Sequence, residues 1–183
     1  MLVLGMGTTS PAQPEVAGTA SDRVEYYEIE GATPDELRRE MDRRGPLDDQ
    51  GRRRDAFARW RISWSWPLKS SGKPDFAGAI SQFEGVMTLP RWRGREDASA
   101  ELVKRWDDFM AAVRRHEEGH LGPARQAAPQ VAEAIRIAAG QNPDLTIREA
   151  HRIAEAVVSS IRAYDREYDE RTRHGQTEGV RWP

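Results

Sequence analysis

Two histidines and a glutamate near the middle of the chain have the types and spacing that suit metal chemistry. They are His116, Glu117 and His120, in the pattern His-Glu-x-x-His. Residues four apart on a helix lie one turn apart on the same face, so both imidazoles could reach one ion. Zinc accepts imidazole nitrogen at about 2.0–2.1 Å. Glu117 would then lie near the open side of that ion, where its carboxylate could take a proton from an activated water.

A helix with two core histidines and no metal is the competing interpretation of this motif. The pattern is short, and it also arises by chance in helices rich in charge. His is scarce here, with four in 183 residues, and two of the four fall at ligand spacing. A buried neutral pair without metal would need other hydrogen-bond partners. The motif alone therefore leaves both interpretations open.

The segment before the motif predicts the helix that carries it. Its apolar residues recur at steps of four, three and four, and the next steps reach His116 and His120; they are Leu102, Trp106, Phe109 and Val113. This periodicity places both imidazoles on the inward stripe of one amphipathic helix. Asp97 or Ser99 is the expected N-cap. Gly122-Pro123 and Pro129 predict that the helix ends or kinks just past the histidines, with a further helix running to Gly140.

The other elements predict a protein that mixes strands and helices. Strands are expected at 24–29, at 59–68, where three tryptophans alternate with polar residues, and at 80–89. Thr33 and Thr146 each precede a glutamate by three residues, the capping-box pattern of a helix start. The tryptophan face could be a sugar or peptide platform. Packing of that face against helices is the stronger expectation, because a sheet buries one face by default.

The C-terminal segment from Tyr168 to Gly175 holds a third notable histidine. His174 follows the predicted end of a helix, where a loop could bring its ring towards the motif. A lone C-terminal histidine is more often solvated, but beside His-Glu-x-x-His it is the natural candidate for a third metal ligand. Asp169 is the substitute ligand, or a residue that orients a ligand histidine. Tyr168 is either a stabiliser of a developing negative charge or a core residue.

Length and composition bound the class of protein. The chain has 183 residues, a formal net charge of −2 and no cysteine, so neither a disulfide nor a thiolate zinc site is possible. The basic residues are not concentrated on one face, so nucleic acid is not an expected partner. No apolar run is long enough for stable membrane insertion. Residues 1–22 are expected to be a flexible leader or an export-signal remnant. Residues 23–183 are expected to form a single domain, and nothing indicates its oligomeric state.

Several motifs occur together in one order. They are Tyr27-Glu28-Ile29-Glu30-Gly31 before the Thr-led helix, Trp60-Arg61-Ile62-Ser63-Trp64, Leu89-Pro90-Arg91-Trp92, His116-Glu117-Glu118-Gly119-His120, and the segment from Tyr168 to His174-Gly175. In these motifs the chain resembles a bacterial family of domains of unknown function described as predicted secreted zinc-dependent proteases. The resemblance extends over nearly everything from Val24 onward, and the two histidine motifs are its specific part.

The resemblance implies a zincin-like metallopeptidase of the α+β class, with a small, mostly antiparallel sheet packed against helices that include the motif helix. It implies Zn²⁺ on His116 and His120, and Glu117 as general base. We expect His174 to be the third ligand and Tyr168 to stabilise the oxyanion. A peptide or protein substrate and a periplasmic or secreted location follow from the same resemblance. Two alternatives remain: a non-catalytic binding or scaffold domain with a structural zinc site, and a metal-free helical interaction protein.

Overall fold

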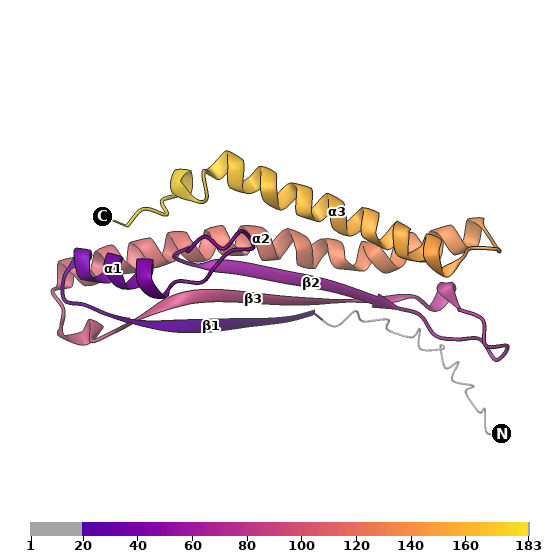
Figure 1. Cartoon of the computed structure of the whole chain (residues 1–183), viewed down its shortest axis with the longest axis horizontal. Helices are drawn as coiled ribbons and strands as arrows, with labels where there is room; N and C mark the ends of the chain where they lie inside the picture. Colours follow the sequence, from indigo (N-terminus) through magenta and orange to yellow (C-terminus); the bar gives the residue numbers. More distant parts are fainter. Residues whose placement is uncertain (1–19, 183) are drawn as a thin grey trace, which may run out of the picture.

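The computed structural model describes residues 20–182 of the chain. It contains three strands and three helices, drawn in Figure 1, besides short 3₁₀ turns: β1 (Ala20–Glu30), α1 (Pro34–Arg44), β2 (Phe57–Ser65), β3 (Ile80–Arg93), α2 (Ala100–Gln141) and α3 (Ile147–Thr172). The α+β class is therefore confirmed. The predicted leader, residues 1–22, lies outside the described residues except for its last three, which begin β1. Within the described range no helix is both long and apolar enough to cross a membrane.

The three strands form one mixed sheet in the order β1-β3-β2. β2 pairs with β3 in antiparallel fashion, but β1 pairs with β3 in parallel over its whole length, from Ala20 opposite Phe83 to Glu30 opposite Arg93. The prediction of a mostly antiparallel sheet is therefore wrong. The reason is the connection: α1 and β2 lie between β1 and β3 in the chain, and a crossover of that length can return a strand in the same direction.

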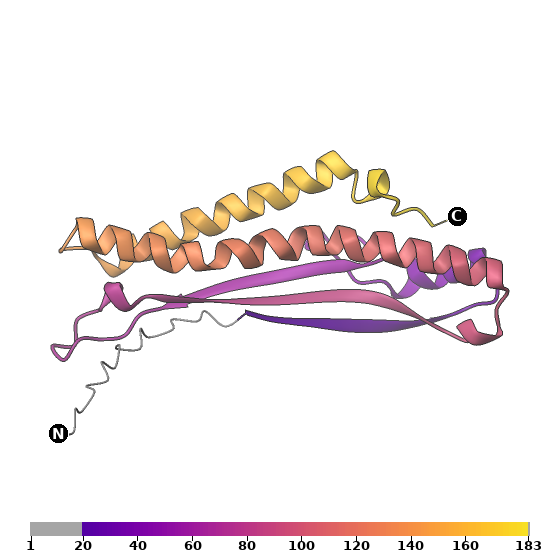
Figure 2. The same cartoon turned by 180° about the vertical axis from the view of Figure 1, so that it is seen from behind.

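One face of the sheet is buried beneath α2, and the opposite face is exposed. From Ser81 to Leu89 of β3 every second residue is buried, including Phe83, Met87 and Leu89. The tryptophan face of β2 also packs on helices, as the stronger expectation had it: the indole N–H groups of Trp60 and Trp64 donate to Asp165 and His151 of α3. Figures 1 and 2 show α2 along the sheet, with α3 beside α2 on the side away from β1.

The helix α2 is continuous from Ala100 to Gln141, starting at the predicted N-cap Ser99. The prediction that this helix ends after the histidines, with a separate helix up to Gly140, is therefore wrong. Pro123 and Pro129 both lie inside the helix, on partly or fully exposed positions. Burial of the opposite side of α2, which includes Leu121, Ala124 and Ala128, outweighs the local cost of the lost backbone hydrogen bonds. A helix of this length spans about 60 Å.

Candidate metal centre

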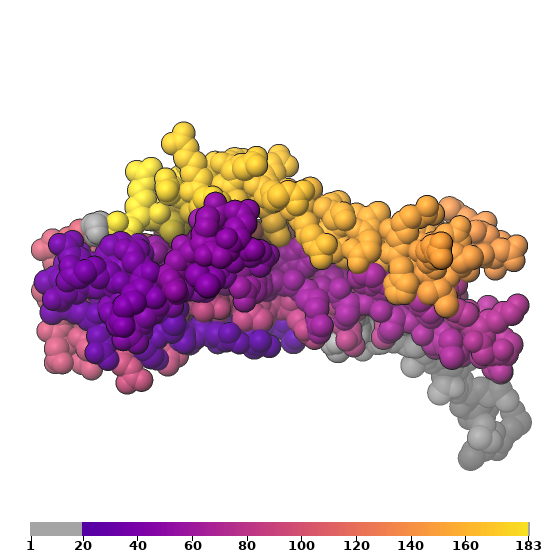
Figure 3. All heavy atoms as spheres, in the orientation of Figure 1, coloured from indigo at the N-terminus to yellow at the C-terminus, as the bar shows by residue number. Residues whose placement is uncertain are grey.

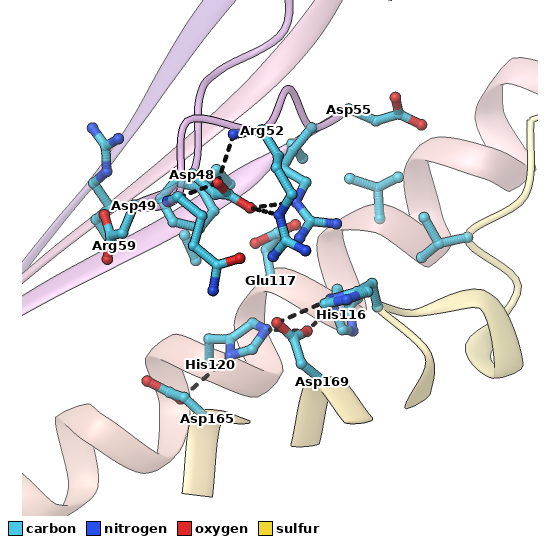
Figure 4. Close-up of a pocket in the computed structure, with 18 of the residues that line it drawn as sticks. Asp48, Asp49, Arg52, Asp55, Arg59, His116, Glu117, His120, Asp165 and Asp169 are labelled. Atoms are coloured by element: carbon cyan, nitrogen blue, oxygen red, sulfur yellow. Dashed lines mark hydrogen bonds and ion pairs between the residues drawn. The ribbon is translucent and has the colours of Figure 1, made fainter. Parts of the chain in front are cut away.

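The two histidines of the motif lie side by side on the buried side of α2. Their ring centroids are 5.0 Å apart. His116 is 5% exposed, and His120 is partly buried. The Nε2 atoms of both rings face the same carboxylate oxygen, Oδ1 of Asp169, at 3.3 Å each. Each of these three side chains offers one ligand atom within 4.8 Å of the others (Figure 4). The histidine spacing and the approach of α3 thus bring three metal-binding atoms to one place.

The second nitrogen of each imidazole has its own carboxylate partner. Nδ1 of His116 lies 3.1 Å from Glu178, in the 3₁₀ turn η3 (Gln176–Glu178), and Nδ1 of His120 lies 3.3 Å from Asp165. Metal-binding histidines commonly donate their other N–H to a carboxylate, which fixes the tautomer and the ring orientation. The donor set and its supporting partners therefore fit a divalent metal ion such as zinc, which accepts imidazole nitrogen and carboxylate oxygen.

The ionisation of this cluster follows from its mixture of acids and bases. Burial alone would lower the pKa of His120, but the carboxylates of Asp165 and Asp169 outweigh it and raise the pKa to about 10. His116 has a raised pKa for the same reasons, with Asp169 and Glu178 as partners. Burial alone would raise the pKa of Asp169, yet the two imidazoles hold it well below its usual range. In the metal-free protein the carboxylates therefore favour the protonated form of both imidazoles.

Glu117 lies beside the histidines and is 7% exposed. Burial raises its pKa, an effect that the two imidazoles and the backbone N–H of Ala58 in β2 partly offset. Its side chain lines the same groove as the metal-binding group. Figure 4 shows the carboxylate between the histidines and the loop that carries Asp48 and Arg52. A carboxylate with a raised pKa at this position is a stronger base than an exposed glutamate.

His174 lies next to the candidate metal group but is not one of its three members. Its Nδ1 atom is 3.1 Å from Oδ2 of Asp169, and its side chain is 47% exposed. The chain turns sharply after α3 because Arg173, His174 and Gly175 all have left-handed backbone conformations. A Cβ on Gly175 would come within 2.9 Å of the His116 ring, so glycine permits this close turn. The predicted third ligand therefore contacts Asp169, and Asp169, the substitute candidate, faces both histidines.

Tyr168 packs beneath the histidine pair. Its ring stacks on His116 at 5.1 Å and lies edge-on to His120 at 5.0 Å, and its hydroxyl donates to Glu178 at 2.9 Å. The side chain is 7% exposed, and the residue is not among those that line the groove. This placement agrees with the core alternative for Tyr168. Its predicted part in catalysis stays a prediction, to which the position of the hydroxyl lends no support.

Gly119, inside the motif, makes room for this packing. A Cβ at Gly119 would lie 2.3 Å from the hydroxyl oxygen of Tyr168. Any side chain here would push α3 away from α2 at the level of the metal-binding group. The glycine therefore sets the distance between the two helices that supply the ligands.

The metal-binding group opens into a groove of about 720 Å³. One wall is the loop before β2 together with Phe57–Trp60 of β2, and the other is the last turns of α3. β2 is an edge strand of the described sheet, because it pairs with β3 alone. The volume lies within the range of small-molecule and peptide sites. The space-filling view in Figure 3 shows the loop standing against the C-terminal part of α3.

Sequence reasoning missed two residues of the site, Asp165 and Glu178. Asp165 precedes Asp169 by four residues, the same spacing that separates the two histidines, and this repeat of the i, i+4 pattern was the signal available. Glu178 has no such signal. It lies 62 residues from His116 and reaches the site only through the turn that follows α3.

The fold and the site together define an α+β protein with a two-histidine, one-aspartate candidate metal centre on two packed helices. The chain belongs to the family described as "Bacterial protein of unknown function (DUF922)", whose model matches residues 24–175. The match includes both histidine motifs and ends just before η3. Searches of curated proteins and of solved structures found no match to this chain.

Proposed function

We propose that this protein is a zinc-dependent peptidase in which His116, His120 and Asp169 hold the metal. The observation that carries the proposal is the convergence of these three ligand atoms beside the buried carboxylate of Glu117, at the floor of a groove. Three protein ligands with an open position are typical of catalytic zinc. A bound metal ion would supply the polarisation of the substrate carbonyl and of the attacking water.

Glu117 is the general base in this proposal. Its carboxylate accepts a proton from the attacking water and then donates it to the leaving amine. Burial raises the pKa of Glu117, which makes its carboxylate a stronger proton acceptor in the first half of this transfer. Glu178 and Asp165 act indirectly, by holding the imidazoles of His116 and His120 in orientation.

The substrate class follows from the wall that β2 supplies. Four consecutive residues of β2, Phe57 to Trp60, line the groove. One edge of β2 pairs with β3, and no other strand of the described sheet pairs with its second edge. An extended peptide could add to this edge through main-chain hydrogen bonds. We therefore propose a peptide or protein substrate, and, from the family resemblance, a periplasmic or secreted enzyme.

The decisive experiment compares Glu117→Gln with Glu118→Gln. Glu118 is the adjacent residue, is half exposed and pairs with Arg125 at 2.9 Å, so it is a matched control outside the site. Assayed on denatured casein, the zinc-loaded Glu117→Gln protein should lose about 10²- to 10⁴-fold in activity, the usual share of a general base. It should keep its zinc and its unfolding temperature, and Glu118→Gln should retain activity.

A structural zinc site is the second candidate, because a fourth donor lies at hand. Nδ1 of His174 is 3.1 Å from Asp169, and its rotation towards the metal-binding group would close the coordination shell. A closed site does not need Glu117. A parent protein that holds zinc, unfolds at a lower temperature once the zinc is removed, and cleaves no peptide would favour this scaffold function over the peptidase.

A further inference from the structure

Arginines line both walls of the groove that leads to the metal-binding group. Four are in or next to β2 and two are on α3: Arg52, Arg53, Arg54, Arg59, Arg162 and Arg166. Whole-chain composition gives no hint of this, since the formal net charge is −2. The concentration of cations in one groove is a property of the fold alone.

The arginines of the β2 wall are largely engaged by the protein itself. Asp48 accepts hydrogen bonds from Arg52 at 3.0 Å and from Arg54 at 2.9 Å. Arg53 and Arg59 donate to backbone carbonyls, those of Gly45 and Leu47, at 2.6 and 2.7 Å. Both of these guanidinium groups keep their charge uncompensated, because a carbonyl is neutral.

The two arginines of α3 have no partner among residues 20–182. Neither Arg162 nor Arg166 makes an ion pair or a side-chain hydrogen bond there, and both are exposed. Of the acids near them on α3, Asp165 is engaged by His120 and Asp169 by both histidines. Glu167 and Glu170 are exposed and do not line the groove. On the rest of the groove wall, Asp48 and Asp55 are paired with arginines. Asp49 and Glu117 are the other acids that line it. Cations therefore outnumber the free acids along the groove.

The spacing of these arginines matches the residues of an extended peptide. Arg166 and Arg162 precede Asp169 on α3 by three and seven residues, about 4.5 and 10.5 Å along the helix axis. An extended peptide advances about 3.3 Å per residue. Consider a peptide that lies along the groove with its reacting bond at the metal-binding group. Its side chains one to three residues from that bond would lie near these guanidinium groups.

We infer that Arg162 and Arg166 select acidic peptides, binding aspartate or glutamate side chains one to three residues from the scissile bond. The inference rests on the proposed peptidase function and adds its substrate class. Arginine presents donors in a planar fork that fits a carboxylate, and such charge-assisted hydrogen bonds are stronger than neutral ones. Arg53 and Arg59 add to the positive field from the opposite wall.

The test uses binding by a zinc-loaded protein that carries Glu117→Gln, so that no peptide is consumed. The probes are blocked eight-residue peptides that alternate alanine with aspartate, asparagine or lysine, titrated calorimetrically near 0.15 M salt. The aspartate peptide should bind at least about tenfold more tightly than the asparagine peptide, and the lysine peptide weakest. Arg162→Gln with Arg166→Gln should reduce this preference to about threefold or less.

The matched control is Arg148→Gln with Arg152→Gln. These arginines lie on the same helix with the same spacing of four, are exposed, and do not line the groove. This control should leave the preference for the aspartate peptide intact. Equal binding of all three peptides, absence of any binding, or an equal loss of preference in the control would each overturn the inference.

Repeating the titrations on metal-free protein separates this inference from the proposed function. The preference for the aspartate peptide should survive without metal, because the guanidinium groups rather than zinc bind its carboxylates. A protein that holds no zinc would refute the peptidase while leaving the arginine result standing. A zinc-loaded, active protein that does not distinguish aspartate from asparagine would refute the arginine inference alone.

Discussion

The middle of α2 and the end of α3 carry matching pairs of side chains with opposite chemistry. α2 presents two imidazoles four residues apart, and α3 presents two carboxylates, Asp165 and Asp169, with the same spacing. The bases are nearly buried, whereas the acids are 23% and 33% exposed at their side chains. Each pair shifts the pKa of the other, upward for the bases and downward for Asp169. The motif on α2 is thus half of a site that α3 completes.

The fit between the two helices can be broken most strongly at Gly119. Gly119→Ala would place a methyl group 2.3 Å from the Tyr168 hydroxyl, so Tyr168 and α3 must shift. Overpacking of this kind should lower the free energy of unfolding by about 3 kcal/mol, measured by chemical denaturation of the metal-free protein. Weakened zinc binding should accompany the loss.

Gly140 supplies the matched control for this substitution. It lies near the end of the same helix, is exposed, and a Cβ there would meet no atom within 4 Å. Gly140→Ala should therefore stabilise the protein by up to about 1 kcal/mol through helix propensity. A Gly119→Ala protein as stable as Gly140→Ala would contradict the close approach of α2 and α3.

Glu178, which follows α3, should affect the affinity for zinc although it is not a ligand. Glu178→Gln removes the charge that fixes His116 through Nδ1 and that accepts the hydroxyl of Tyr168. Zinc affinity should fall about 10- to 100-fold, the usual effect of losing such a partner, as measured by competition with a fluorescent chelator. Thr177→Val, which alters the neighbouring residue of η3, should leave affinity within about threefold. Unchanged affinity in Glu178→Gln would remove Glu178 from the site.

The opposed pKa shifts predict a dependence of stability on pH in the metal-free protein. The pKa of His120 is about 10 when folded and 6.5 in the unfolded chain, so the charged ring stabilises the fold. That stability is complete below pH 6.5 and is lost as the pH rises towards 10. Between these values the free energy of unfolding should fall by at least about 1 kcal/mol more in the parent than in Asp165→Asn.

Urea denaturation at both pH values measures this difference. Zinc-loaded protein should lack it, because metal-bound imidazoles carry no proton to lose. Parallel pH profiles of the metal-free parent and of Asp165→Asn would show that Asp165 does not hold the charge of His120.

Features set by neighbours along the chain could be predicted from the sequence. The capping boxes of Thr33 and Thr146, the N-cap Ser99 and the alternation along β2 all depend on residues a few positions apart. The grouping of His116, Glu117 and His120 depends on one helical turn in the same way. Each of these predictions is confirmed as local structure.

Features set by packing could not be predicted in this way. The parallel pairing of β1 with β3 and the passage of α2 through Pro123 and Pro129 depend on what lies against them in the fold. The choice between Asp169 and His174 depends on the rotation and end of α3. Asp169 lies on the face towards α2, whereas His174 follows the left-handed turn and lies on the far side of Asp169.

Zinc content after dialysis, measured by elemental analysis of parent, Asp169→Asn and His174→Gln proteins, decides whether the two histidines bind metal and which residue is the third ligand. We predict one zinc per chain in the parent and in His174→Gln, and less than about a tenth of that in Asp169→Asn, because Asp169 is the carboxylate that faces both histidines among residues 20–182. A parent protein without metal would contradict the account. So would retention of zinc by Asp169→Asn together with its loss from His174→Gln.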